Sequence, residues 1–432
     1  MKVSKKFIFL LLFIAPFLFT NRIDQTYIFE TFLASLFLVA MTIFFIFFNI
    51  DRKDGSVLDI TFWVFVYIFI GMVSIIQMNA NEIPWVNFSK YSYLSTQAII
   101  IFIIGVFSFI FGRYSKLKID IPDREISLRS LNIFLVVNLL GLFIVLSSIG
   151  FKSLILPRVL YTSLILESGY LNILITSLLQ NSWMLCLIGY IHLLKRNQIS
   201  IYFLIPLILI SVIYFNPIRS DRFSFFTLYI ILLFSFFGFN KKLWAFLLIS
   251  GLVFIFPFAD IFRSLNEQVN FELSALGDNF LDGDFDAFST VLMSIYVVKL
   301  NSYLYFANFF SPLYIYIPRQ FWSSKPISSS DLITNELNIN YPDIVISLWG
   351  EGFLGFGLLG VIILLYCIGV YIKSFSYLKK TNDFQHLLFF MSMPTLLFVL
   401  RGNIYDMSFK LVPILLFCLM ITKKRNNFSS VP

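Results

Sequence analysis

Residues 31–50 read TFLASLFLVAMTIFFIFFNI, twenty consecutive positions without a charged side chain. A helix of about 20 apolar residues is long enough to cross the hydrocarbon core of a bilayer. Lipid offers the backbone no hydrogen-bond partners, so a helix is the form that satisfies each N–H and C=O group within such a segment. The stretch therefore predicts a membrane-spanning helix.

Similar apolar segments recur along the whole chain. Of its 432 residues, 59% are hydrophobic and 13% are charged, whereas a soluble domain carries about 25% charged residues. We expect an all-α polytopic membrane protein with about twelve spanning helices. The predicted spans are residues 7–20, 31–50, 58–77, 96–112, 131–149, 170–193, 201–216, 223–238, 243–258, 352–372, 384–400 and 407–422.

The basic residues in the connectors predict how the chain is oriented. Lys and Arg gather in alternate connectors, and the net charge of +8 comes from these short segments. Cytoplasmic loops carry such an excess, so the pattern predicts that both termini are cytoplasmic. The charge is thus a matter of topology, and we expect no nucleic-acid partner. The first and last basic groups are Lys2, Lys5, Lys6, Lys423, Lys424 and Arg425.

The predicted spans divide the chain into three parts. Residues 1–258 hold helices 1–9 with short loops, and residues 346–432 hold helices 10–12 and a basic cytoplasmic tail. Between them, residues 259–345 form a large loop on the extracytoplasmic side. Its apolar stretches 288–298 and 302–317 are too short to span, so we expect interfacial or re-entrant helices there.

Arginines near the predicted outer ends of spans indicate a site for an anion. In NPIRSDR (216–222), Arg219 and Arg222 stand three apart, on one face of a helical turn. Two guanidiniums on one face can grip phosphate oxygens, although arginines at span ends also reach the headgroups for ordinary structural reasons. The other basic candidates are Arg158, Arg263, Arg319, Lys325 and Arg401, each of which could instead form a structural ion pair.

Glu351 is the carboxylate that we single out, within SLWGEGFLGFGLLG (347–360). A carboxylate placed there could accept a proton during catalysis. The alternative is an acidic residue that stabilises the positive N-terminal end of a helix. Because His192 and His386 both fall at predicted cytoplasmic ends of spans, proton transfer on the outer face would require a carboxylate.

The acidic stretch DNFLDGDFD (278–286) suggests calcium but departs from the EF-hand pattern. Ala287 stands where that loop needs glycine, and Met293 where it needs a bidentate glutamate. We therefore expect no metal, and we keep Asp278 as a substrate-binding candidate. The three cysteines lie in apolar runs, and the chain has no nucleotide-binding motif, so we expect no cofactor.

Four local motifs and the long loop after the ninth span resemble bacterial O-antigen and capsular polysaccharide repeat-unit polymerases, the Wzy family. The motifs are NPIRSDR (216–222), ADIFR (259–263), YIPRQFWSSKP (316–326) and SLWGEGFLGFGLLG (347–360). The resemblance implies a fold similar to the GT-C class. It also implies a metal-independent glycosyltransferase that joins undecaprenyl-diphosphate-linked oligosaccharides at the outer face of the cytoplasmic membrane.

The same resemblance implies roles for the candidate residues. Arg219, Arg222, Arg263 and Arg319 would hold the lipid diphosphate, and Glu351 would take the proton of the acceptor hydroxyl. The residues expected to line the substrate around them are Lys325, Arg158, Arg401 and Asp278. Membrane lipid, a chain-length regulator and a flippase would be further partners.

Two alternatives remain open. A lipid-linked oligosaccharide flippase would usually carry charges at mid-membrane depth, and the predicted spans hold few. An O-antigen ligase is expected to use a histidine in the large outer loop, and residues 259–345 contain none.

Overall fold

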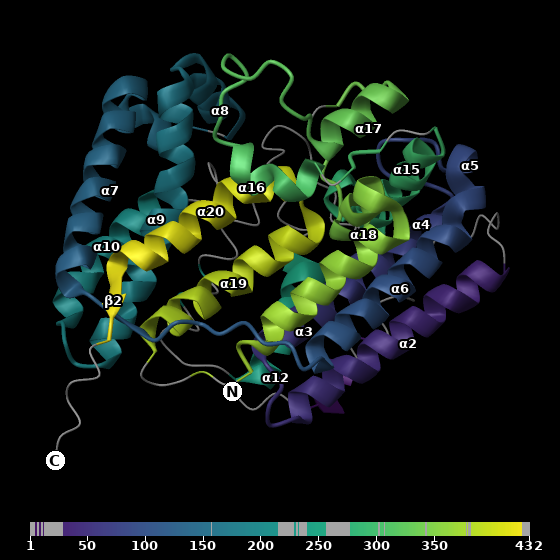
Figure 1. Cartoon of the computed structure of the whole chain (residues 1–432), viewed down its shortest axis with the longest axis horizontal. Coiled ribbons are helices and arrows are strands. Elements are labelled where there is room, and N and C mark those ends of the chain that lie inside the picture. Colours follow the sequence, from purple (N-terminus) through teal and green to yellow (C-terminus); the bar gives the residue numbers. More distant parts are fainter. Residues whose placement is uncertain are drawn as a thin grey trace. The chain divides into compact units, whose positions relative to one another are not determined.

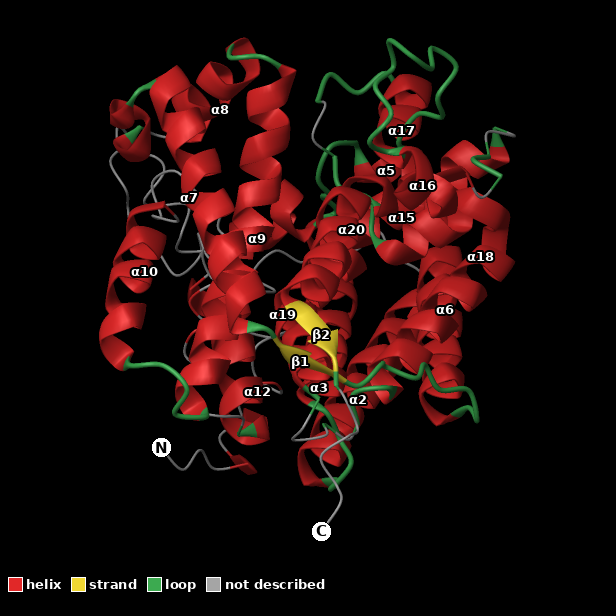
Figure 2. Cartoon of the chain, turned by 60° about the vertical axis from the view of Figure 1, so that its left-hand side comes forward, coloured by secondary structure: helices red, strands yellow, loops and turns green. Residues whose placement is uncertain are grey.

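The computed structural model describes most of the chain. The described residues are 5–6, 8–9, 12, 29–156, 158–214, 229, 232, 240–255, 277–300, 303–305, 307–341, 344–376, 378 and 382–425. Within them the protein is mostly helical, with a single short pair of strands (Figure 2).

The chain falls into two units. The first comprises Met1–Ile119, Asn240–Ser376 and Leu396–Ser408, and the second comprises Asp120–Phe239, Tyr377–Thr395 and Phe409–Pro432. Figure 1 labels helices α19 (Asp383–Arg401) and α20 (Ile404–Ile421). Each of these helices contributes residues to both units. Each unit is therefore discontinuous in sequence.

Among the described residues, seven helices are long and apolar enough to cross a membrane. They are Phe29–Asp51 (α2), Val57–Ala80 (α3, η1 and α4), Phe88–Tyr114 (α5, η2 and α6), Leu128–Ile149 (α7), Leu348–Lys373 (α18), α19 and α20. The protein is thus a helical, membrane-embedded chain, as its composition predicted. The total of twelve spans and the GT-C-like fold remain predictions.

The remaining predicted spans have mixed outcomes. Helices also cover residues 170–193, 201–216 and 243–258 wholly or in part, as α9 (Tyr170–Lys195), α10 (Ile201–Tyr214) and α12 (Lys241–Ser250), which η4 (Gly251–Ile255) continues. The predicted spans 7–20 and 223–238 lie largely outside the described residues.

The first unit is organised by the packing of α6 (Ser95–Tyr114) against α18. A Cβ at Gly105 would lie 2.7 Å from Cδ1 of Trp349, and one at Gly369 would lie 2.7 Å from the backbone N of Arg113. Small residues at such contacts let two membrane helices approach closely. The indole of Trp349 also donates a hydrogen bond to the Phe102 carbonyl, at 3.3 Å. The first turn of α18 is therefore fixed against α6.

Helix α18 does not run straight, although the sequence predicted an uninterrupted span over 352–372. Phe356 (φ −163°, ψ 42°) and Gly357 (φ 57°, ψ −146°) leave the helical conformation, and the positive φ of Gly357 favours glycine. A Cβ at Gly352 would lie 2.7 Å from the Val361 N. Nine residues of straight helix would separate these positions by about 13.5 Å. The chain therefore turns back here, and Glu351 lies on a short helical segment before the turn.

The segment predicted as an outer loop contains helices of two kinds. Helix α15 (Ala287–Lys299) packs on α18 and α6, and most of its residues are buried by protein, so it does not lie on a surface. The described part of the apolar stretch 302–317 does not form one continuous helix. In its place are the single turns η7 (Ala307–Phe310) and α16 (Ser311–Tyr314), where Pro312 begins a new turn. The other elements are η5 (Asn279–Leu281), η6 (Gly283–Phe285) and α17 (Ser329–Leu337).

The second unit buries its own apolar core. Its helices α7 and α9 pack together and α10 packs on α9, with residues such as Leu131, Trp183 and Leu207 in the centre. The shorter elements η3 (Phe151–Ile155) and α8 (Arg158–Glu167) connect α7 to α9.

A strand pair in the second unit was not predicted. Strand β1 (Arg124–Ile126) pairs antiparallel with β2 (Thr422–Lys424), with Glu125 opposite Lys423. The buried Asp383 side chain accepts hydrogen bonds from the Ile126 N–H, at 2.8 Å, and pairs with Arg196 at 2.7 Å. Each strand has only three residues, so the hydropathy of the sequence could not predict the pair.

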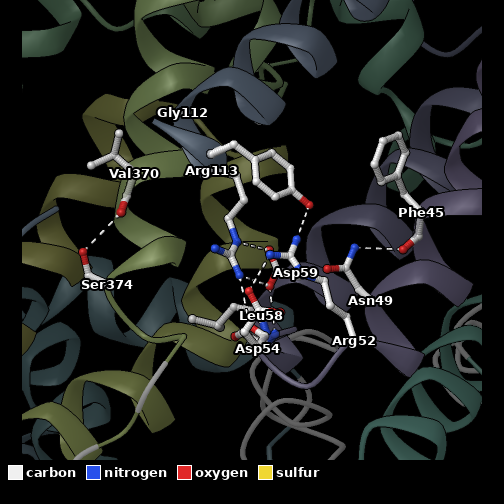
Figure 3. Close-up of polar contacts among 12 residues, drawn as sticks. Phe45, Asn49, Arg52, Asp54, Leu58, Asp59, Gly112, Arg113, Val370 and Ser374 are labelled. Carbon is white, nitrogen blue, oxygen red and sulfur yellow. Dashed lines mark hydrogen bonds and ion pairs between the residues drawn. The ribbon is translucent and has the colours of Figure 1, made fainter. Parts of the chain in front are cut away.

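A buried ion pair joins the C-terminal end of α6 to the N-terminal end of α3 in the first unit (Figure 3). Arg113, in the last turn of α6, donates to both carboxylate oxygens of Asp59, at 2.7 and 2.9 Å. Asp59 also accepts from the Ser56 N–H in the capping box that begins α3 (Val57–Phe65). Arg113 further donates to the Asp54 carbonyl, at 3.2 Å. Both charged partners are buried, so removal of one leaves the other without compensation.

We expect Arg113→Met to destabilise the first unit strongly, because breaking a buried pair from one side costs about 3–5 kcal/mol. The measurement is the thermal unfolding midpoint in detergent, followed by size-exclusion chromatography. The double variant Arg113→Met with Asp59→Asn should recover part of the loss, and Lys116→Met, at an exposed position, is the control. A double variant as unstable as the single one would contradict this account.

We expect Gly352→Ala to disturb the turn within α18, because its new methyl group would press on the backbone of Val361. Gly141→Ala is the matched control: its nearest neighbour is the flexible end of the Leu179 side chain, at 3.0 Å. The readout is the yield of monodisperse protein after extraction and its unfolding midpoint. Equal behaviour of the two variants would refute the close contact.

Candidate active site

Glu351 lies in the first turn of α18 and is fully buried. The turn begins at Ser347, whose hydroxyl accepts from the Gly350 N–H as a helix cap. An acidic residue at this position suits the positive end of the helix. Local sequence therefore accounts for the placement of Glu351, and its partners come from elsewhere in the chain.

Two neutral side chains hold the Glu351 carboxylate. The Ser329 hydroxyl donates to Oε1, and the Asn308 amide donates to Oε2. The same amide nitrogen donates to the Glu351 carbonyl, at 3.2 Å. Three separate segments, η7, α17 and α18, thus meet at one carboxylate. Among the described residues, no Lys or Arg forms an ion pair with it.

Asn403 links this group of residues to a second one. Its Nδ2 donates to Ser330 Oγ at 2.8 Å and to Asp406 Oδ2 at 2.9 Å, and its Oδ1 accepts from the Ile346 N–H at 2.6 Å. Ile346 lies five residues before Glu351, and Ser330 lies beside Ser329. Asn403 therefore joins α17, which supplies Ser329, to the segment that carries Glu351.

Sequence reasoning missed Asn308, Ser329 and Asn403. A capping signal was present for Ser329, because Ser328 and Asp331 form a capping box at the start of α17. It predicts where the helix begins but not which group it meets. Asn308 and Asn403 carry no comparable local signal.

Lys325 and Arg319 lie in one loop and stabilise it from within. The buried Lys325 ammonium donates to the carbonyls of Ile315 and Ile317, at 2.8 and 2.9 Å, and lies over the rings of Tyr314 and Tyr405. Arg319 is exposed and donates to the Lys325 carbonyl at 2.9 Å. These contacts are thus with the loop itself and, for Lys325, also with Tyr405 of α20.

Arg401 forms ion pairs with acidic side chains, which is the structural role given above as the alternative to substrate binding. Its guanidinium donates to the Gly283 carbonyl at 3.0 Å and pairs with Asp284 at 3.4 Å and Asp286 at 3.7 Å. Trp85 donates to Asp286 from its indole, at 3.4 Å. Burial raises the pKa of Asp286 to about 6, and the nearby Arg401 limits the rise.

The other predicted site residues are not brought together in the described part of the chain. Asp278 is exposed at the start of η5. Arg158 begins α8 in the second unit, where only its backbone is described. Arg219, Arg222 and Arg263 lie outside the described residues. The shared cationic pocket therefore stays a prediction.

The described residues contain no group of three or more His, Cys, Asp or Glu side chains that could hold a metal ion. Comparisons with protein-family models, with curated proteins and with solved structures find no match.

The pKa of Asp286 predicts a pH dependence of stability. Because its folded-state value of about 6 lies above the usual 3.8, the folded protein holds this proton more tightly. The resulting stabilisation is full below about pH 4 and is lost as the pH rises to about 6. We expect the unfolding midpoint of the wild type, relative to Asp286→Asn, to fall over this range. A constant difference across the range would contradict the prediction.

Proposed function

We propose that the protein polymerises undecaprenyl-diphosphate-linked oligosaccharide repeat units into O-antigen or capsular polysaccharide at the outer face of the cytoplasmic membrane. The membrane-embedded helical chain and the motifs described above support this proposal. The observation that carries it furthest is the buried Glu351 carboxylate, which neutral donors alone hold among the described residues.

Neutral donors matter because they leave the carboxylate uncommitted to an ion pair. Elsewhere in the described chain, buried carboxylates such as Asp59 and Asp286 face an arginine. Asp383 pairs with Arg196 in the same way. Glu351 differs from all three, so we assign it the acceptor role in proton transfer.

The proposed reaction forms a new glycosidic bond at the anomeric carbon and breaks the bond between that carbon and the diphosphate. A hydroxyl of the incoming repeat unit attacks the anomeric carbon of the growing chain. The bond to the diphosphate oxygen breaks, and undecaprenyl diphosphate leaves with the electron pair. The hydroxyl proton passes to Glu351. Arg219, Arg222, Arg263 and Arg319 would stabilise the charge that develops on the leaving diphosphate.

The burial of Glu351 adds a requirement to this mechanism. Glu351 is fully buried, with Asn308 and Ser329 beside its two oxygens, so an acceptor hydroxyl reaches the carboxylate only when a neighbouring group moves. Asn308 lies in η7 and Ser329 lies in α17, so both belong to the segment that runs from η7 to α17 and not to α18. In this proposal, a shift of that segment opens the site when substrate binds.

We expect Glu351→Gln to lower the polymerisation rate by about 10²–10⁴-fold, the usual contribution of a general base. Gln has the same shape as Glu. The Asn308 side-chain amide can rotate by about 180°, so that its Oδ1, which has no hydrogen-bond partner, accepts from the new Gln amide. Folding should therefore survive. The assay uses purified protein in nanodiscs with the lipid-linked repeat unit and follows the ladder of products on a gel.

The control is Glu336→Gln, the same substitution at an exposed position of α17, which should retain the wild-type rate. A wild-type rate in Glu351→Gln would remove Glu351 from the mechanism and leave the polymerase assignment standing. Gene deletion tests the assignment itself: a polymerase defect leaves single repeat units at the surface. A flippase defect leaves none, and a ligase defect leaves long chains on the lipid carrier.

A further inference from the structure

The segment Ala307–Pro326, which we call the arm, has an inner face fastened to the site and to α20. Asn308 of the arm donates to Glu351. The hydroxyls of Ser311 and Ser408 lie 3.0 Å apart, and the rings of Tyr314 and Tyr405 lie 6.1 Å apart. These contacts place the arm beside the first turn of α20, which is a candidate spanning helix.

The outer face of the arm is apolar and exposed. Leu313 and Phe321 are 80% and 83% exposed, and Phe310 is 60% exposed. Burial of a Leu or Phe side chain is favourable, so a protein rarely leaves several together in water. Ile317 and Trp322 are also exposed, at 39% and 37%.

The charged residues of the arm are all basic. Between Ala307 and Pro326 the sequence contains no acidic residue, and Arg319 is its exposed cation. Arginine beside Trp and Tyr is typical of the boundary between lipid headgroups and acyl chains. Such a surface complements the lipid phosphates and, just beneath them, the hydrocarbon.

We infer that the arm rests in the interfacial layer of the bilayer, with Leu313 and Phe321 inserted among the acyl chains and Arg319 at the phosphates. The start of α20 sets the depth of the arm, because Ser311 contacts Ser408 and Tyr314 contacts Tyr405 within the first two turns of that helix. The arm is not an amphipathic helix: its apolar side chains come from two single turns and a loop. Through Asn308, it holds Glu351 close to the membrane surface. The inference does not depend on the proposed reaction.

The test measures the depth of labels on the arm. Leu313→Cys and Phe321→Cys, each combined with Cys367→Ser to remove the exposed native thiol, carry an NBD fluorophore in nanodiscs. We expect lipids brominated along the acyl chain to quench most of the emission and aqueous iodide to quench little. Asn335→Cys, exposed on α17, is the matched control and should show the reverse.

Two results would overturn the inference. Labels at 313 and 321 quenched by iodide as strongly as the label at 335 would place the arm in water. Labels quenched by neither agent, with cross-linking between copies, would show that a second copy covers it. If the cysteine variants do not fold, Trp322→Phe offers another route. The native protein should lose part of its bromolipid quenching of Trp emission on that substitution, and an unchanged signal would again refute the inference.

Discussion

The close contact between α6 and α18 is the constraint on which the rest of the first unit depends. Glycines on both helices, Gly105 and Gly369 among them, remove the side chains that would hold the backbones apart. Between membrane helices, packing of this kind replaces the hydrophobic drive that operates in water. Because Trp349 is pinned to α6, the short segment that precedes the turn in α18 has a fixed position. The Glu351 carboxylate is fixed with it.

Charge is used in two ways in the described residues. Arg113 with Asp59, and Arg401 with Asp284 and Asp286, join segments through ion pairs. Around Glu351 the segments are joined instead by the Ser329 hydroxyl and by the side-chain amides of Asn308 and Asn403. Breaking a buried ion pair from one side costs about 3–5 kcal/mol, whereas one hydrogen bond from a neutral donor to a charged group contributes about 1.5–3 kcal/mol. A single donor to Glu351 is therefore released at lower cost than an ion-pair partner.

The sequence predicted most helices well because lipid imposes their form and length, and α2 and α7 begin and end within three residues of the predicted spans. It failed where tertiary contacts decide. Hydropathy cannot distinguish a straight apolar helix from one that turns back at Gly357. Within the candidate site, Glu351 was singled out from its local sequence alone. Ser329 and Asn308 were not, because they lie 22 and 43 residues away in sequence.

The strand pair of the second unit has a consequence for biogenesis. Arg124 of β1 bonds Thr422, 298 residues later in the chain. At synthesis rates of about 5–20 residues per second, β1 waits roughly 15 to 60 seconds for its partner to leave the ribosome. Throughout that interval the helices between them enter the membrane while the β1 edge stays unpaired. The order of translation, more than the strength of any contact, sets when the second unit can close.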